Sequence, residues 1–330
     1  PPAGRTTGSR FGTREATSSL RSSAHDPDRN PPQSIDDIGR LLAKHRYIAD
    51  RSLAVSIFLS ITLKKPLFLE GEAGVGKTEV AKVLASGLQR PLIRLQCYEG
   101  LDINHAVYEW NYARQILHIR LAETGAPSGA AVIEREIFTP EFLIKRPLLQ
   151  AIDRGTEAPV VLLIDEIDRA DEEFEAFLLE VLSDFQITIP ELGTFKAAQP
   201  PLVILTSNRT REVHDALKRR CLYHWIEYPT LEREAAIVTA KVPGIADQLA
   251  REASAFVASL RNERVYKQPG VAETIDWAEA LQALGQTALD EKVVADTLGC
   301  LLKYQEDLKS IQERGLHNRI VDAKRAAANV

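Results

Sequence analysis

The stretch GEAGVGKT, residues 71 to 78, has the residue types and the spacing of a phosphate-binding loop. Its glycines let backbone N–H groups curl around an anion, and a following helix adds its positive N-terminal end. Lys77 can then meet the β and γ phosphates of ATP, and Thr78 offers a hydroxyl to Mg²⁺. The residues expected to bind the nucleotide are Gly71, Glu72, Ala73, Gly74, Val75, Gly76, Lys77, Thr78 and Glu79. A chance glycine-rich turn is the alternative, which the flanking strand and helix patterns disfavour.

Two adjacent carboxylates follow a second apolar run, VVLLIDEIDRA, at residues 160 to 170. Asp165 is expected to hold Mg²⁺ directly or through water. Glu166, a carboxylate that is ionised at neutral pH, can orient and activate a water for attack on the γ phosphate. Taken alone, the pair could equally be acidic residues that favour a helix N-terminus. Together with the phosphate-binding loop, the pair indicates catalysis.

The elements that must position these residues alternate between strand and helix patterns. Short apolar strand patterns are PLFLE (66–70), PLIRLQ (91–96), PVVLLID (159–165), PLVILTSN (201–208) and YHWIEYP (223–229). Between residues 170 and 185, apolar residues recur at helical spacing on one face. The alternation predicts an α/β fold with a parallel sheet between helices. From residue 230 onward the strand signals stop, so a smaller all-helical domain is expected there.

Length and composition fit one α/β core plus a smaller domain in a chain of 330 residues. The net charge of −5 argues against general adhesion to nucleic acid. Three cysteines, Cys97, Cys221 and Cys300, are far apart and are expected to be reduced thiols, which suits the cytoplasm. The longest apolar run, residues 53 to 63, is too short to cross a bilayer, so no transmembrane segment is expected.

The expected organisation has three parts. Residues 1–33 are polar and rich in Arg, Ser and Pro, which predicts a disordered tail, with a transit peptide as the alternative interpretation. Residues 34–229 form the nucleotide-binding core, which opens with a helix capped by Ser34 and Asp37. Residues 230–330 form the helical domain.

From about residue 35 to its end, the chain resembles the AAA+ ATPases. The resemblance implies a P-loop NTPase core with a five-stranded parallel sheet and a C-terminal helical lid. Asn208 matches the sensor 1 position, which helps to place the attacking water. DALKRRC, residues 215–221, resembles the arginine-finger segment, with Arg220 the better match and Arg219 the second. A finger acts across a subunit boundary and implies a ring, whereas two solvated arginines at a helix end are the alternative.

One feature departs from the AAA+ pattern. The lid stretch GVAETIDWAEAL, from residue 270, contains three acidic residues and no base, so the sensor 2 arginine is missing. Arg264 or Lys267 could substitute for it. The departure puts in doubt how lid movement is coupled to the γ phosphate.

Within the AAA+ proteins, the chain resembles the MoxR family and its CoxD-like group. The stretches that carry this resemblance are YEGLDINHAVYEWNYARQ, FLIKRPLLQAI and LIDEIDRADEEFEAFLLEVLSDFQITIPELGTF. The family has an insertion in the second core helix, here at about 98–125, and a hairpin before sensor 1, here at about 185–197. The resemblance implies a hexameric ATPase that acts as a chaperone with a von Willebrand A domain partner. Its implied client is a molybdenum-containing carbon monoxide dehydrogenase or a relative.

Two other functions stay open. A DNA-associated AAA+ motor is disfavoured by the acidic balance and by the absence of an added DNA-binding module in this sequence. A nucleotide-dependent scaffold that hydrolyses slowly is kept open by the missing sensor 2 arginine.

The insertion contains the aromatic and basic segment NHAVYEWNYARQILHIR, residues 104 to 120. Alternate positions carry large apolar side chains, which predicts a hairpin: Tyr108, Trp110, Tyr112, Leu117, Ile119 and Leu121. Packing of these aromatics on the core is one interpretation, and anchoring of a protein client or adaptor is the other. A nucleic-acid role could use Arg114 and Arg120, but Asp102 and Glu109 would repel phosphate. We therefore expect this segment to couple ATP turnover to a protein partner.

Overall fold

The architecture is taken from a computed structural model that describes residues 32–123, 136–155, 157–313 and 315–329. The predicted disordered tail, with its transit-peptide alternative, lies outside the described residues up to residue 31. Across the described ranges, no helix combines the length and the apolar character needed to cross a membrane.

A five-stranded parallel sheet forms the centre of the core, in the order β2-β5-β8-β1-β9. The strands are β1 (Leu67–Gly71), β2 (Leu92–Gln96), β5 (Val161–Asp165), β8 (Leu202–Ser207) and β9 (Leu222–Ile226). Strand β5, which ends in Asp165, lies between β2 and β8, and β1, which leads into the phosphate-binding loop, lies between β8 and β9. Because all five strands are parallel, their carboxyl ends meet at one edge of the sheet. All five predicted strands are therefore present, and the predicted fold class is confirmed.

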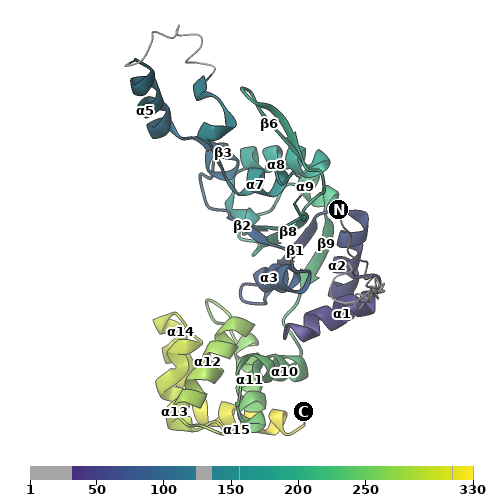
Figure 1. Cartoon of the computed structure of the whole chain (residues 1–330). Helices are drawn as coiled ribbons and strands as arrows, with labels where there is room; N and C mark the ends of the chain where they lie inside the picture. The colour runs from purple at the N-terminus through teal and green to yellow at the C-terminus, as the bar shows by residue number, and fades with distance from the viewer. Residues whose placement is uncertain (1–31, 124–135, 156, 314, 330) are drawn as a thin grey trace, which may run out of the picture.

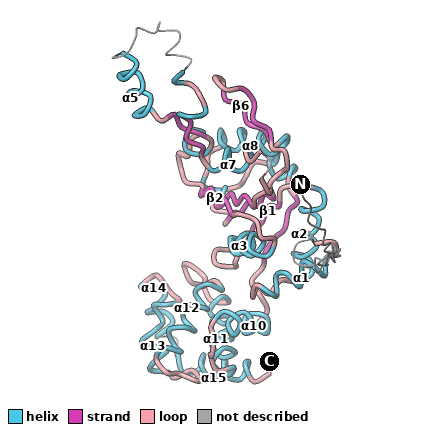
Figure 2. The backbone as a smooth tube through the Cα atoms, viewed as in Figure 1, coloured by secondary structure: helices cyan, strands magenta, loops and turns pink. Residues whose placement is uncertain are grey.

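Helices cover both faces of the sheet, as the buried strands require. The core helices are α1 (Ile35–Lys44), α2 (Arg51–Leu63), α3 (Lys77–Gly87), α7 (Pro147–Ile152), α8 (Glu172–Asp184) and α9 (Asp215–Arg220). Side chains alternate along β1: Leu67 and Leu69 pack with α1, α2 and α3, whereas Phe68 packs in the cluster formed with α7, α8 and α9. Figure 2 shows the strands gathered in the middle of the core. The expected capping box of Ser34 and Asp37 is present at the start of α1.

Two short antiparallel pairs are added to this core. Strands β6 (Gln186–Ile189) and β7 (Gly193–Lys196) form a hairpin, where the sequence predicts one at about 185–197. Strand β3 (Tyr108–Trp110) pairs with β4 (Leu143–Lys145) over three residues. A short helix, α4 (Ile103–Ala106), precedes β3.

The expectation that the whole segment 104–120 forms a hairpin is wrong, because residues Tyr112–Glu123 form helix α5. Asn111 starts this helix: its side-chain oxygen accepts the backbone N–H of Arg114 at 3.1 Å, and its carbonyl accepts that of Gln115 at 2.9 Å. The apolar residues after Tyr112 fit both the strand and the helix period. Strand β4 offers only three partners, so capping at Asn111 decides the outcome.

The described residues of the C-terminal part, here called the lid, form helices joined by turns and loops, with no strand. It consists of α10 (Leu231–Lys241), α11 (Asp247–Arg261), α12 (Val271–Ala283), α13 (Glu291–Thr297), α14 (Gln305–Glu313) and α15 (Leu316–Ala327). Its apolar cluster is its own, with Phe256 and Trp277 in contact at 5.3 Å between ring centroids. The expected domain division at residue 230 falls at the N-cap of α10. Figure 1 shows the lid and α5 at opposite ends of the molecule.

A buried ion pair fixes the shape of the lid next to the core. Arg261 is bound by both oxygens of Glu234 at 2.6 and 2.7 Å, and Glu234 is fully buried. Thr274 donates to the same carboxylate at 2.7 Å, and Arg261 also donates to the carbonyl of Pro269 at 2.8 Å. The network joins α10, α11 and α12 and holds the loop that leads into Gly270. Loss of one charge from such a pair leaves the other buried and unpaired, which is strongly destabilising.

Candidate active site

The phosphate-binding loop joins β1 to α3 at the carboxyl edge of the sheet. Gly74 and Gly76 adopt left-handed conformations with φ of 78° and 93°, which a residue with a Cβ seldom adopts. These turns allow successive N–H groups to face one concavity, at the N-terminus of α3. The loop thus has the backbone form that binds an anion.

Lys77 lies against the loop that it follows. Its Nζ donates to the carbonyl oxygens of Gly71 at 2.8 Å and Glu72 at 2.6 Å, and the residue is 6% exposed. Burial lowers the pKa of Lys77 to about 8, although nearby carboxylates, among them Asp168 and Asp165, act in the opposite direction. The charged ammonium form of Lys77 is therefore less favoured than that of an exposed lysine, and phosphate oxygens would stabilise it.

Asp165 is buried, with 2% of its surface exposed, and it ties three elements together. Its Oδ1 accepts the hydroxyls of Thr78 at 2.9 Å and Thr206 at 2.5 Å, from α3 and β8. Its Oδ2 accepts from the Arg94 guanidinium on β2, at 2.6 Å for the nearest nitrogen. A hydroxyl and a carboxylate at this separation are the hard oxygen ligands that Mg²⁺ takes beside nucleotide phosphates. The donor set therefore fits the metal predicted from the sequence.

Glu166 adopts a left-handed backbone conformation, φ 56°, which is uncommon for a residue with a side chain. Its N–H donates to the Thr206 hydroxyl at 2.9 Å, which holds the turn. The Glu166 Oε1 lies 3.5 Å from the Asn208 amide nitrogen, and its Oε2 lies 3.1 Å from Arg169 Nε. The fold thus brings Glu166 and Asn208 together from two neighbouring strands.

Asp168 is a site residue that the sequence reasoning did not select. It is 2% exposed and accepts the backbone N–H groups of Asn208 at 3.2 Å and Thr210 at 2.9 Å. It also accepts the Thr210 hydroxyl at 2.6 Å. These bonds set the position of the turn that carries Asn208. Its place in the run DEIDRA, three residues after Asp165, was the available signal.

A cleft of about 500 Å³ lies between the core and the lid and opens onto the phosphate-binding loop. Glu166, Asn208 and Thr78 line the end of the cleft beside the phosphate-binding loop. The other end is lined by side chains with apolar surface from the core and the lid, including Tyr47, Ile48, Ile226, Pro229, Ile237 and Ile275. A cleft with phosphate-binding groups at one end and apolar walls at the other suits a nucleotide.

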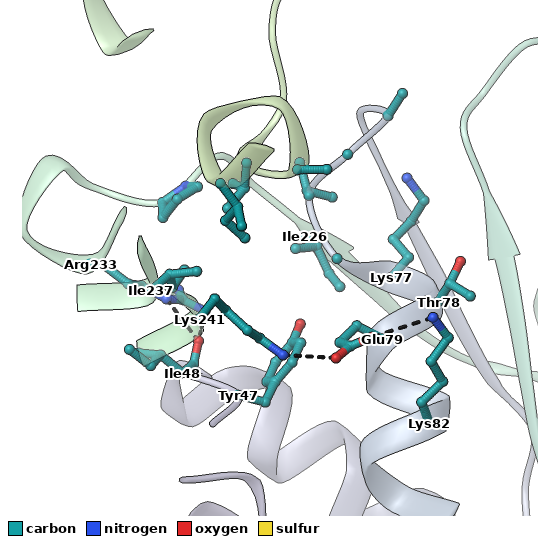
Figure 3. A pocket seen from close by; sticks show the side chains of 18 of the residues that line it. Tyr47, Ile48, Lys77, Thr78, Glu79, Lys82, Ile226, Arg233, Ile237 and Lys241 are labelled. Carbon is teal, nitrogen blue, oxygen red and sulfur yellow. Dashed lines mark hydrogen bonds and ion pairs between the residues drawn. The ribbon is translucent and has the colours of Figure 1, made fainter. Parts of the chain in front are cut away.

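Arg264 and Lys267, the proposed substitutes for sensor 2, are exposed in the loop before α12, and neither is among the described residues that line the cleft. The lid's basic contribution comes instead from α10. Lys241 pairs with Glu79 at 2.8 Å, and Arg233 donates to the Ile48 carbonyl at 2.9 Å, as Figure 3 shows. Glu79, expected to bind the nucleotide, thus also connects the core to the lid.

The lid also touches the phosphate-binding loop directly. The N–H of Ala272 donates to the carbonyl of Gly74 at 3.1 Å. A Cβ on Gly270 would lie 2.6 Å from the carbonyl oxygen of Ala73, and one on Gly74 would lie 2.9 Å from Glu273 Oε2. Two glycines therefore allow a close approach of backbones, and movement of α12 must move the loop or break this contact.

Arg219 and Arg220 end α9 and are both exposed. Neither lines the cleft of its own chain, and neither makes an ion pair with a described residue. The structure therefore does not bring either arginine into the site that the phosphate-binding loop forms.

The aromatic segment divides between the core and the surface. Trp110 is only 7% exposed and meets Phe138 edge-on at 5.2 Å between ring centroids, so the core-packing interpretation is correct for this residue. Tyr112, Ile116 and Leu117 on α5 are instead 63%, 59% and 59% exposed. The most exposed large apolar side chains of the insertion are thus on α5, while Tyr98 and Ile103, which precede it, are each 45% exposed.

The cysteines agree with the expectation of reduced thiols. Cys97, Cys221 and Cys300 are all free. Burial raises the pKa of the thiols of Cys97 and Cys221 to about 12, so neither forms a reactive thiolate at neutral pH.

Comparison with known proteins agrees with this geometry. A family model described as AAA domain (dynein-related subfamily) matches residues 66–221. Together with the strand order, this match gives the core an AAA+ P-loop NTPase fold.

Individual relatives are distant. Chaperone protein ClpB 2 of Parasynechococcus marenigrum is 33% identical over 145 residues, which are 43% of this chain and 13% of that protein. An uncharacterised protein of Staphylococcus haemolyticus is 27% identical over 195 residues, 57% of this chain and 65% of that protein. The chain thus spans less than two thirds of the length of these two relatives. A solved structure of the Thermotoga maritima RuvB Holliday junction branch migration motor is 16% identical, with a TM-score of 0.42, covering 81% of this chain and 71% of that one.

The environment of Lys77 predicts a pH dependence of nucleotide binding. Phosphate favours the charged ammonium, so the pKa of Lys77 is higher in the complex than in the free protein, and binding takes up a proton above about pH 8. ATP affinity should therefore fall as pH rises above 8, approaching about tenfold per pH unit. Binding titrations with a fluorescent ATP analogue, repeated at pH values from about 7.5 to about 9.5, measure this change in affinity. Lys77→Ala should bind ATP weakly, and its affinity should not fall with pH in this range. A wild-type affinity that does not change with pH would contradict the role of Lys77 in binding phosphate.

Proposed function

We propose that this protein is an AAA+ ATPase that hydrolyses ATP with Mg²⁺ to drive maturation of a client enzyme. The observation that carries the proposal is the meeting of two pairs at one cleft. Asp165 lies 2.9 Å from the Thr78 hydroxyl, and Glu166 lies 3.5 Å from the Asn208 amide. These contacts support Thr78 and Asp165 as metal ligands and Glu166 and Asn208 as a water-activating pair.

The residues divide the chemistry between them. The loop N–H groups and Lys77 bind the phosphates, while Thr78 and Asp165 hold Mg²⁺, whose charge offsets that of the β and γ phosphates. Glu166 accepts a proton from the attacking water. Asn208 contacts one oxygen of the Glu166 carboxylate and orients it toward the cleft. Arg169 contacts the other oxygen.

The positions of the two arginines support a ring. Arg220 and Arg219 are exposed at the end of α9 and away from their own cleft, which is the arrangement needed to reach a neighbour's γ phosphate. A closed ring of identical subunits gives every cleft one such arginine. The resemblance to the MoxR family implies that this ring has six subunits.

The client side of the proposal rests on α5. Its exposed Tyr112, Ile116 and Leu117 lie at the end of the molecule opposite the lid, and aromatic and apolar side chains of this kind anchor protein partners. The MoxR resemblance supplies the partners, a von Willebrand A domain protein and a molybdenum-containing carbon monoxide dehydrogenase-like client in the cytoplasm. The ClpB match, to a protein named as a chaperone, supports protein rather than nucleic acid as the substrate.

The first test separates binding from turnover. Glu166→Gln should bind ATP within about twofold of the wild type and lose at least about a hundredfold in turnover, because an amide cannot accept the proton. Lys77→Ala should instead weaken ATP binding by about tenfold or more, because it removes a charge-assisted contact to phosphate. Equilibrium binding and steady-state phosphate release measure the two effects.

The same assay distinguishes the other candidate functions. Stimulation of wild-type turnover by duplex DNA would favour a DNA-associated motor. Very slow turnover that no added protein stimulates would favour the scaffold, which the missing sensor 2 arginine keeps in consideration. Unchanged turnover in Glu166→Gln would remove Glu166 as the base.

The second test concerns the ring. Arg220→Ala should lower turnover by about a thousandfold if the guanidinium stabilises charge on a neighbour's phosphoryl group. Mixing with Glu166→Gln subunits should restore part of it, because mixed interfaces pair an intact Glu166 with an intact Arg220. Arg219→Ala is the matched control and should retain most turnover. A fully active monomer in sedimentation with ATP would exclude the ring.

The third test concerns α5. Ile116→Asp with Leu117→Asp should leave ATP turnover unchanged, because α5 lies far from the cleft, while activation of the client in the cell is lost. Leu284→Asp, at a lid position that is 56% exposed, is the control for an added surface charge. Wild-type client activity with the α5 variant would contradict the coupling role.

A further inference from the structure

Arg94 donates a charged hydrogen bond to Asp165, and the proposed chemistry does not use it. It comes from β2, the edge strand of the sheet, and its Nε and one terminal nitrogen both reach Asp165 Oδ2, at 3.0 and 2.6 Å. The same terminal nitrogen also donates to Gln96. The guanidinium therefore makes a two-nitrogen contact with a carboxylate that is otherwise buried.

The two oxygens of Asp165 have different partners, and this division has a consequence for the metal. Oδ1 receives the hydroxyls of Thr78 and Thr206. Thr78 can keep this bond and still offer a lone pair to Mg²⁺, since a hydroxyl has two lone pairs. Oδ2 is thus the oxygen that remains for the metal or its water ligands, and Arg94 holds it.

The side chain of Arg94 is half exposed, in contrast to Asp165, whose side chain is 3% exposed. A guanidinium at the edge of the sheet can leave for solvent, whereas a buried carboxylate that loses its bonded guanidinium needs another cation to avoid a large desolvation cost. Two cations beside one carboxylate also repel each other. Arg94 and Mg²⁺ therefore compete for Asp165.

We propose that Arg94 is the counter-ion of Asp165 in the nucleotide-free protein and sets the Mg²⁺ concentration at which nucleotide binds. Arg94 keeps the empty site charge-balanced, and it gives up Oδ2 when Mg²⁺ and nucleotide enter together. It is a positioning residue that acts through Asp165. The inference rests on the proposed magnesium-dependent nucleotide site.

The test is a titration of ADP binding against free Mg²⁺, which requires no turnover. Arg94→Met removes the charge and keeps an unbranched apolar stem, and it should lower the half-saturating Mg²⁺ concentration about fivefold, as expected for a partly exposed charge pair. Arg94→Lys keeps a positive charge, and its half-saturating Mg²⁺ concentration should lie between those of Arg94→Met and the wild type. Arg90→Met, which removes a positive charge from the loop before β2, should match the wild type.

Thermal unfolding supplies a second readout. Without ligand, Arg94→Met should unfold about 5 °C below the wild type, because Asp165 is left buried without a cation. Mg²⁺ alone should raise the unfolding temperature of the variant more than that of the wild type. With saturating Mg²⁺ and ADP, the two proteins should unfold at the same temperature.

The outcomes distinguish the inference from the proposed function. Wild-type protein that binds no ADP at any Mg²⁺ concentration would refute the nucleotide site itself. Normal wild-type binding with an unchanged Mg²⁺ midpoint in Arg94→Met would overturn only the role of Arg94. Equal destabilisation with and without ligand would also overturn it, because Arg94 would then be a purely structural residue. Weaker ADP binding at saturating Mg²⁺ would do the same, because Arg94 would then contact phosphate.

Discussion

A single buried carboxylate, that of Asp165, holds the site together. It accepts hydroxyls from α3 and β8 and a guanidinium from β2, so it fixes the metal-binding end of the phosphate-binding loop against the middle of the sheet. An ionised carboxylate is stable at this depth only if its oxygens are fully bonded. The Thr206 hydroxyl also accepts the N–H of Glu166 and so holds that residue in its left-handed turn. The positions of Asp165 and Glu166, the proposed metal ligand and the proposed base, are therefore set by one network.

The lid meets this network through backbone rather than through a sensor 2 arginine. Gly270 packs against the loop at Ala73 and Gly74, and the Arg261–Glu234 pair holds the segment that leads into Gly270. A glycine contact transmits position but carries no charge to the γ phosphate. The basic groups of α10, Arg233 and Lys241, reach the core beside the cleft and bind protein groups there. In this protein the lid thus contacts the loop directly at two glycines, in addition to the contacts that Arg233 and Lys241 make with the core.

The insertion combines a part that is buried in the core with a part that is exposed. Its first part, with Trp110 buried beside Phe138, anchors it to the core. Its second part, α5, extends from this anchor with large apolar side chains in solvent. Burial of Trp110 gives α5 a fixed base, which a surface that binds a partner needs in order to avoid a large ordering cost.

The sequence by itself determined the fold class, the five strands and the loop chemistry, because these depend on local patterns: apolar runs, glycines at fixed spacing, and carboxylates at a strand end. It was misleading at residues 112–123, where one apolar pattern fits two periods and the cap at Asn111 decides for a helix. Arg94 and Gly270 could not be assigned from sequence, and for Asp168 the run DEIDRA marks the position but not the contacts. Their roles come from contacts with residues that are distant in the sequence. Arg94 contacts Asp165, 71 positions away, Asp168 contacts Asn208, 40 positions away, and Gly270 contacts Gly74, 196 positions away. Only the tertiary structure decides such contacts, because strand order and lid docking bring those groups together, and no spacing along the chain records either.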